Sequence, residues 1–431
     1  MVHNFVVRRF GPLLLPPHSM PLTGMVLDCG SGHTSILWYE MSLTGQIRQI
    51  RRSKLKVPAG GNFKITDAFE VHDVAPSASV FADAISVELD DAKDAGIDAP
   101  GIVVVGATGG LRNMLHDGRV TTSQLLEYKA LLLSGLRPSS RRVTKFEVIS
   151  GEQEAAWELR AANIIFGPKV RQMFPGASKR ARRGFGLFSG GGSSVQVQAG
   201  SGPPLSYPLS TWCGPEMDEA LGATLDAWRQ PETWARWELA LLAKIEEAKA
   251  SLQGRRFDGC FVLTAMNHVA ASAAGFAETP IQASEAICRL DAALDQFRAA
   301  VDFEGAAEPC KSFVGGRHSM HPTVSAWYSS QSPHHLARVG ALHICRLRHA
   351  LCHLFEPGAM LFAPPATESS GDHLDCEWTL QCFALEAHTL MSPPMRSRRL
   401  RALWASCYSP IRFAARTKNS ARRSSPGPIV V

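Results

Sequence analysis

The chain has 431 residues, 45% of them hydrophobic and 19% charged, and its formal net charge is +6. This composition excludes a wholly disordered chain, because disordered chains combine few apolar residues with a high net charge. The length suits two or three domains. No apolar run reaches the roughly 18 residues of a spanning helix, so we expect no membrane span. Nine basic and no acidic residues lie in 391–431, so the rest of the chain carries a net charge of −3.

Cysteines and the N-terminal segment bear on the compartment. Ten cysteines are too few for a disulfide scaffold, and no Cys-x-x-Cys pair or Cys/His cluster has zinc-site spacing, so we expect no structural zinc. The basic pair Arg8 and Arg9 is followed by only three leucines before Pro16, too few for the apolar region of a secretory signal. Either the protein is not exported or this start is incomplete, and the localisation stays open.

The first half of the chain alternates between strand and helix patterns. Residues 25–27 form an apolar strand, and a glycine-containing turn leads into a second apolar run at 35–41. A polar, alternating stretch at 46–57 completes a predicted three-stranded meander. The elements that follow are a helix at 78–92, an all-apolar strand at 101–105, a strand at 146–149 and a helix at 152–165.

The second half follows an exposed basic connection at 169–183. A strand at 185–188 enters a glycine-rich loop at 189–194 and a strand at 195–197 leaves it, as in the first half. We therefore predict an internal repeat of structure. The later elements are helices at 238–252, 280–300, 333–355 and 377–390 and a strand at 260–263. From 393 on, proline, serine, arginine and glycine dominate without periodicity, which predicts a disordered tail.

Two loops of small residues follow apolar strands. The first contains Gly30, Ser31, Gly32 and His33, and the second contains Gly190, Gly191, Gly192, Ser193 and Ser194. Small residues let phosphate oxygens approach backbone N–H groups, so two such loops can grip a phosphate chain. Either loop alone is most often only a turn between strands. The pair, with the loop 106–112 between them, favours a phosphate site.

Charged side chains also stand at the ends of strands. Glu154, at the start of a helix, can accept a proton from an attacking water. The alternative role, a solvated residue near a helix N-terminus, fits Glu152 better. Asp28 ends a buried strand, where a carboxylate needs a partner or a cation. Arg112 has a plainer alternative, which is to pair with a surface carboxylate.

Four segments of the chain form an ordered series. They are 27–35 (Leu-Asp-Cys-Gly-Ser-Gly-His-Thr-Ser), 106–112 (Gly-Ala-Thr-Gly-Gly-Leu-Arg), 149–154 (Ile-Ser-Gly-Glu-Gln-Glu) with Trp157 and Asn163, and 189–196 (Ser-Gly-Gly-Gly-Ser-Ser-Val-Gln). This series resembles the first four signature regions of the apyrases, or nucleoside triphosphate diphosphohydrolases. Weaker matches at 210–221 and 377–380 extend the resemblance over 25–390.

The resemblance implies a fold class. It is α/β, with two RNase H-like lobes of the actin, sugar-kinase and exopolyphosphatase type and an interlobe nucleotide cleft. Lobe I is expected to comprise 24–163, completed by a returning C-terminal helix near 377–392, and lobe II to comprise 164–376. Residues 1–23 stay unassigned, and 393–431 form the basic tail.

The resemblance also implies roles for individual residues. Glu154 is the base that activates water, Ser194 and Gln196 hold that water, and Arg112 neutralises phosphate charge. The phosphate-binding residues are Gly30, Ser31, Gly32, His33, Thr108, Gly190, Gly191, Gly192 and Ser193. The residues near a hydrated Mg²⁺ or Ca²⁺ are Asp28, Thr108, Ser189 and, less directly, Trp378.

Several positions depart from the apyrase pattern. The family has an aspartate where this chain has Ser189, and one carboxylate fewer should weaken binding of a hard cation. Ala155 stands in place of the apyrase glycine. In this respect the segment resembles the exopolyphosphatase and guanosine-pentaphosphate phosphatase branch, which also has an alanine after the acid. Asn163 and 210–221 favour the apyrase branch instead.

The expected reaction is cation-dependent hydrolysis of the terminal phosphoanhydride of a nucleoside tri- or diphosphate, by direct attack of the Glu154-activated water. One alternative is an exopolyphosphatase-like hydrolase. Another is a nucleotide-binding protein impaired in catalysis by Ser189. We expect no nucleic-acid partner, because the basic segments lack interleaved aromatic residues. The base preference, the oligomeric state and the disulfide pairing stay open, and the resemblance allows a secretory-pathway lumen if the N-terminus is incomplete.

Overall fold

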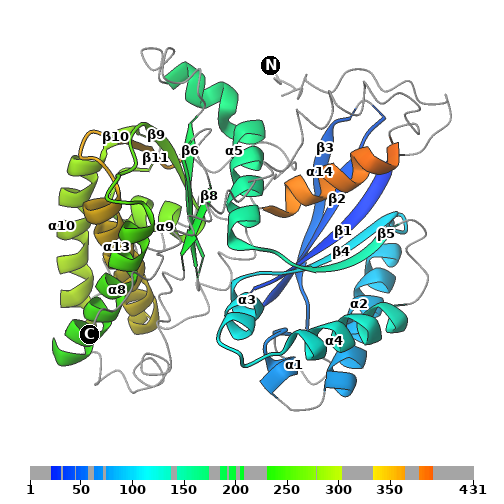
Figure 1. Cartoon of the computed structure of the whole chain (residues 1–431). Helices are drawn as coiled ribbons and strands as arrows, with labels where there is room; N and C mark the ends of the chain where they lie inside the picture. The colour runs from blue at the N-terminus through cyan, green and yellow to red at the C-terminus, as the bar shows by residue number, and fades with distance from the viewer. Residues whose placement is uncertain are drawn as a thin grey trace, which may run out of the picture. The chain divides into compact units, whose positions relative to one another are not determined.

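The computed structural model describes parts of the chain between residues 21 and 391, and two β-sheets organise them (Figure 1). The described residues are 21–30, 33–43, 45–56, 63–70, 74–136, 143–173, 185–191, 194–199, 204–207, 231–277, 279–302, 333–364 and 378–391. Predictions outside them are those on Ser31, Gly32, Gly192, Ser193, 210–221, the N-terminal segment and the basic tail. Both sheets belong to one compact unit. No described helix combines the length and apolarity needed to cross a bilayer.

The first sheet has the strand order β3-β2-β1-β4-β5. Its strands are β1 Leu22–Cys29, β2 Thr34–Met41, β3 Ile47–Lys54, β4 Ile102–Ala107 and β5 Val143–Val148. The first three are antiparallel neighbours, which confirms the predicted meander, while β4 and β5 run parallel to β1. All 6 residues of β4 are buried, as expected of a strand in a parallel sheet covered on both faces.

Helices cover both faces of the first sheet. They are α1 Asp67–Glu70, α2 Val74–Asp94, α3 Gly109–His116, α4 Thr122–Gly135 and, from the C-terminal part, α14 Trp378–Met391. Side chains alternate along β1, so Met25 and Leu27 share one face, where they join a core with α2 and α4. Gly24 lies on the other face against α14, where a Cβ would come within 2.5 Å of the Phe383 ring. The last helix therefore packs against the first sheet.

The second sheet has the strand order β10-β11-β9-β6-β7-β8. Its strands are β6 Gly186–Gly190, β7 Val195–Gln198, β8 Pro204–Tyr207, β9 Cys260–Thr264, β10 Ile281–Gln282 and β11 Met360–Phe362. Its helices are α5 Gly151–Met173, α8 Pro231–Ser251, α9 Ala265–Ala273, α10 Ala283–Asp302 and α13 Pro333–Leu354. α5 packs through Leu159 and Ala162 on one face, and the other four helices share the core on the opposite face (Figure 1).

The two sheets repeat one plan. In each, an antiparallel hairpin leads to a third antiparallel strand on one side and to parallel strands on the other: β3-β2-β1-β4-β5 matches β8-β7-β6-β9-β11. Asp28 faces Ser35 across the first hairpin, and Ser189 faces Gln196 across the second. The predicted internal repeat and the α/β fold class with two similar halves are confirmed. Asp28 and Ser189 occupy equivalent positions in that repeat.

Some elements differ from the sequence-based predictions. α5 continues to Met173, so the predicted connection at 169–183 begins within a helix. α3 begins at Gly109, so the predicted loop at 106–112 ends within a helix. The other elements without a counterpart among the predictions are α1, α4, α9, β8, β10 and β11. α4 carries leucines around its circumference, with Leu126 exposed and only Tyr128 and Leu132 buried, so it lacks the one-sided apolar stripe that marks a helix in sequence.

Candidate active site

The two hairpins end in loops with the same closing hydrogen bond. In the first, the Gly30 N–H donates to the His33 carbonyl at 3.1 Å, and in the second the Gly191 N–H donates to the Ser194 carbonyl at 2.9 Å. Burial and the neighbouring Lys54 lower the pKa of His33 to about 4, so its imidazole is neutral at pH 7. The His33 side chain therefore brings no formal charge to this first loop.

Arg112 connects the two halves of the repeat. It lies in α3, directly after β4. Its Nη1 donates to the Ile149 carbonyl at 2.8 Å and to Glu154 Oε2 at 3.0 Å, while its Nη2 donates to Ser194 Oγ at 3.2 Å. The guanidinium thus fixes the first turn of α5 against the second hairpin loop. The plainer alternative, a pair with a surface carboxylate, does not hold, because Glu154 is buried.

Glu154 is a buried carboxylate at the start of α5. Its backbone N–H donates to the Ser150 carbonyl at 2.9 Å, which begins the helix. Burial raises the pKa of Glu154 above that of an ordinary carboxyl, against the opposing effects of Arg112 and of a hydrogen bond with Gln196. A raised pKa makes this carboxylate a stronger base than an exposed one. Glu152, by contrast, is exposed.

Ser194 and Gln196 complete a network around this carboxylate. The Gln196 Nε2 donates to Ser194 Oγ at 2.7 Å, and both side chains are buried. Ser194 Oγ therefore accepts from both Arg112 and Gln196. A hydroxyl has two lone pairs and one proton, so Ser194 can make a further hydrogen bond only by donating. The network thus directs a hydroxyl donor and a carboxylate acceptor to neighbouring positions, which is what a nucleophilic water requires.

A second group lies at the end of β1. The Thr108 Oγ1 donates to Asp28 Oδ1 at 3.4 Å, and the Thr108 N–H donates to the Cys29 carbonyl at 3.2 Å. Thr108 is also the residue before α3, and its carbonyl accepts from the Arg112 N–H at 3.1 Å. One helical turn therefore joins the Asp28–Thr108 pair to the Arg112 network.

Trp378 lies over the same strand end. A Cβ on Gly106 would collide with its indole ring, and the ring stacks on Trp157 with centroids 6.1 Å apart. Its indole Nε1 is buried and has no hydrogen-bond partner among the residues that the structure describes. A buried donor of this kind calls for an acceptor from water or a ligand.

Ser189 is buried at the end of β6, opposite Gln196. It is paired along the other side with Thr264 of β9, just as Asp28 is paired with Gly106 of β4. At equivalent positions of the repeat, the first sheet therefore has the carboxylate of Asp28 and the second sheet has the hydroxyl of Ser189. Ser189 and Thr264 therefore supply hydroxyls and no carboxylate at this second strand end.

Two residues that hold the second loop have no counterpart among the sequence-based predictions. The Arg346 Nη1, from α13, donates to the Gly191 carbonyl at 2.6 Å, and Asn267, from α9, donates to the Phe188 carbonyl at 3.3 Å. A Cβ on Gly190 would come within 2.5 Å of both side chains. Asn267 follows a strand as Arg112 does, which is the sequence signal that marks it. Arg346 looks in sequence like a surface arginine, although it is 1% exposed.

Comparison with known proteins gives structural likeness only. No protein-family model matches the sequence, and no curated protein matches it significantly. The Aquifex aeolicus member of the Ppx/GppA protein family has 11% identity and a TM-score of 0.47, over 87% of this chain and 100% of that one. An exopolyphosphatase from Cytophaga hutchinsonii has 12% identity and a TM-score of 0.43, over 85% and 98%. Nucleoside triphosphate hydrolases from Neospora caninum have 15% identity and a TM-score of 0.26, over 42% of this chain and 38% of that one. Such values do not specify a residue's role or a substrate.

Proposed function

We propose that this chain hydrolyses phosphoanhydride bonds by direct attack of a water that Glu154 activates. The observation that carries the proposal is the network of half-buried Arg112 with the buried Glu154, Ser194 and Gln196, which draws on both halves of the repeat. Phosphoryl transfer needs alignment and neutralisation of charge more than covalent help from the protein. A base and an arginine supply both, and two loops of small residues let phosphate oxygens approach the backbone.

Each residue of the network has a separate role in the proposed reaction. Glu154 accepts the proton of the attacking water, and Ser194 and Gln196 orient that water. Arg112 lies within hydrogen-bond distance of Glu154 and Ser194, so its charge is close to the non-bridging oxygens of the phosphoryl group whose phosphorus the water attacks. Ser194 acts as a donor in this scheme, and the reaction proceeds without a phosphoenzyme.

A divalent cation fits the chemistry at the end of β1. Asp28 and the Thr108 hydroxyl are hard oxygen donors, and the buried indole nitrogen of Trp378 lies at the same strand end. A site with only a few protein oxygens is suited to Mg²⁺, because this ion keeps several of its waters and binds one or two carboxylates plus phosphate oxygens. Asp28 and Thr108 would hold the hydrated ion. When bound, it would neutralise charge on the phosphate chain.

For the substrate, we favour a linear phosphate chain of the inorganic polyphosphate or guanosine-pentaphosphate type. Ala155, which distinguishes this branch from the apyrases, is fully buried next to Glu154. Asn163, which favours the apyrases, is exposed and donates to the Leu159 carbonyl of its own helix at 2.8 Å, so it has a local structural role. The nucleoside di- and triphosphates are the second candidate, on the ordered series of four apyrase-like segments.

A phosphate-release panel tests the proposal and separates the two substrates. The full-length chain would be assayed with polyphosphate, guanosine pentaphosphate, ATP, ADP, GDP and UDP, with Mg²⁺, with Ca²⁺ and with EDTA. We expect release from polyphosphate with Mg²⁺ and its loss in EDTA. Release from UDP and GDP without polyphosphate hydrolysis would assign the apyrase reaction instead. No release from any substrate in either metal would leave only a binding role.

The Ser189 position allows a gain-of-function prediction. Ser189→Asp restores a carboxylate at the place equivalent to Asp28, and cation affinity rises with the charge of the ligands. We expect the Mg²⁺ concentration for half-maximal hydrolysis to fall, and Mg²⁺ binding measured by titration calorimetry to tighten in parallel. Ser284→Asp, in the exposed first turn of α10, is the control for added charge. A parent already saturated at low Mg²⁺, with no gain from Ser189→Asp, would show that another group fills the role.

A further inference from the structure

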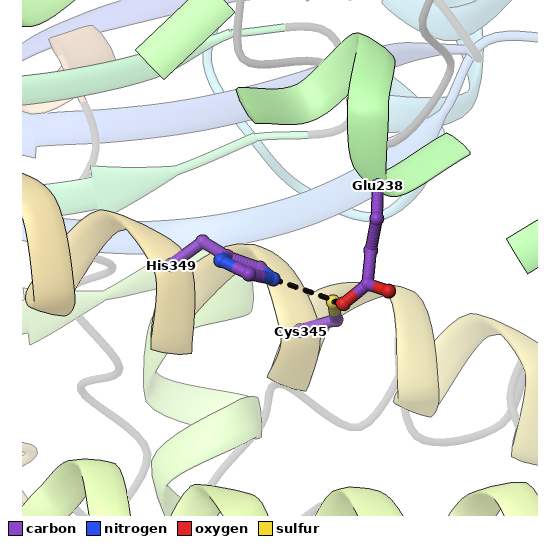
Figure 2. Close-up of side chains that lie close together, drawn as sticks. All are labelled: Glu238, Cys345 and His349. Atoms are coloured by element: carbon purple, nitrogen blue, oxygen red, sulfur yellow. Dashed lines mark hydrogen bonds and ion pairs between the residues drawn. The ribbon is translucent and has the colours of Figure 1, made fainter. Parts of the chain in front are cut away.

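Three side chains converge between two helices of the second half, away from the residues assigned above. Cys345 and His349 lie four residues apart on α13, so both face the same side of the helix, and Glu238 reaches them from α8 (Figure 2). Their ligand atoms, one each of sulfur, nitrogen and oxygen, all lie within 4.8 Å of one another. Cys345 and His349 are buried, and the Glu238 side chain is 29% exposed.

The two distances to the Glu238 oxygen are slightly shorter than those between ligands of a tetrahedral ion. The Cys345 Sγ and the Glu238 Oε1 are 3.4 Å apart, and the His349 Nε2 and the same oxygen are 3.0 Å apart. Zinc bonds of about 2.3 Å to sulfur and about 2.0 Å to nitrogen or oxygen imply ligand separations of roughly 3.3–3.6 Å. A small outward movement of the Glu238 carboxylate therefore accommodates an ion among the three atoms.

The geometry points to a zinc site formed by Glu238, Cys345 and His349, which clips α8 to α13. A thiolate and an imidazole select a borderline-soft ion such as Zn²⁺ over Mg²⁺ or Ca²⁺, which take oxygen ligands. Three protein ligands leave the fourth tetrahedral position to a water, and the exposed edge of Glu238 provides the path to solvent. This site is independent of the proposed hydrolysis.

The expectation of no structural zinc rested on spacing along the chain. Glu238 is 107 residues from Cys345, so no local motif contains the three ligands. Zinc motifs in sequence are recognised when ligands fall within short spacers, and only Cys345 and His349 satisfy that condition here.

The nearest charged groups are compatible with an ion. The Arg348 Nη1 lies 3.5 Å from the His349 Nδ1, but Arg348 is held by Asp291 through a 2.6 Å bond. A metal bound to Nε2 leaves the imidazole proton on Nδ1, where it faces the Arg348 guanidinium. Arg348 would then move away from His349 and keep its pair with Asp291. On the other side, the His349 ring stacks on His353, with centroids 6.2 Å apart.

Metal content and cobalt spectroscopy test this site. The untagged full-length chain, purified under reducing conditions, would be saturated with Zn²⁺, freed of loosely bound metal and measured for zinc by mass spectrometry. A second sample would be loaded with Co²⁺, which gives a thiolate-to-metal absorption band only where a cysteine is a ligand. We expect about one zinc per chain and a clear band, and we expect Cys345→Ser to lose both. Zinc should also raise the Tm of the parent but not of Cys345→Ser.

Matched controls separate this site from the other cysteines and from simple loss of packing. Cys352→Ser and Glu246→Gln, on the same two helices, should keep the zinc and the band. Glu238→Gln and His349→Gln should lower zinc affinity by about 10-fold or more, and they serve if Cys345→Ser fails to fold. A parent that retains no zinc, or a Cys345→Ser variant with undiminished zinc and cobalt band, would show that Glu238 only accepts hydrogen bonds from its two partners.

Discussion

Replacement of Glu154 by glutamine is expected to lower kcat by about 10²–10⁴-fold, while the affinity for substrate changes little. Glutamine keeps the volume and can still accept a hydrogen bond from Arg112, but it cannot take a proton from water. The measurement is steady-state phosphate release from the preferred substrate of the panel, together with equilibrium binding of a non-hydrolysable analogue.

Glu152 provides the matched control for this substitution. It lies in the same first turn of α5 but is exposed, so Glu152→Gln should leave kcat within a factor of about two. Similar losses in both variants would mean that charge near the helix N-terminus, and not proton transfer, is what matters. Unchanged kcat in Glu154→Gln would remove Glu154 from the mechanism altogether.

Replacement of Arg112 by methionine is expected to lower kcat/KM by about 10²–10³-fold and to move the pH dependence. In the proposed mechanism Glu154 acts as a base only when deprotonated, so the rate should rise as pH passes upward through its pKa. Arg112 lowers that pKa, against the larger effect of burial. Its removal therefore raises the pKa of Glu154 further, and the acidic limb of the pH–rate profile moves to higher pH.

Full pH–rate profiles of the parent, Arg112→Met and Arg112→Lys would check this shift. Lysine keeps the charge but lacks the two forked nitrogens through which Arg112 bonds Glu154 and Ser194, so its acidic limb should lie between the other two. Arg119→Met is the control, because Arg119 pairs with exposed Asp117 in the segment after α3. An acidic limb that stays in place or moves to lower pH in Arg112→Met would show that the limb belongs to another group.

The fold was predictable where the chain carries local signals. The turn at Gly30 and the apolar run of β4 are patterns of neighbouring residues, and they correctly place the meander and the buried strand. The repeat also has a local signal, because both hairpins combine a short apolar strand with a loop of small residues. α4 lacked such a signal, since its leucines cover every side of the helix.

The site was predictable only in part, for the same physical reason. Arg112 and Glu154 stand next to strand ends, and a residue's place after a strand can be read along the chain. The sequence does not reveal that Arg346 is buried beneath Gly191, because that contact joins residues 155 positions apart. It likewise does not reveal the meeting of Glu238 with His349. Contacts between helices depend on packing angles that one sequence does not specify.

The return of α14 to the first sheet has a consequence for biosynthesis. The Tyr39 hydroxyl bonds the Thr379 hydroxyl at 2.8 Å, and these residues are 340 positions apart. A ribosome makes the N-terminal part first, so one face of the first sheet, with Tyr39 and Gly24, stays uncovered until the second sheet has been synthesised. The second half can collapse around its own helices during that interval. The nascent first half is therefore incomplete until α14 leaves the ribosome. Until then, the face that carries Tyr39 and Gly24 is accessible to chaperones.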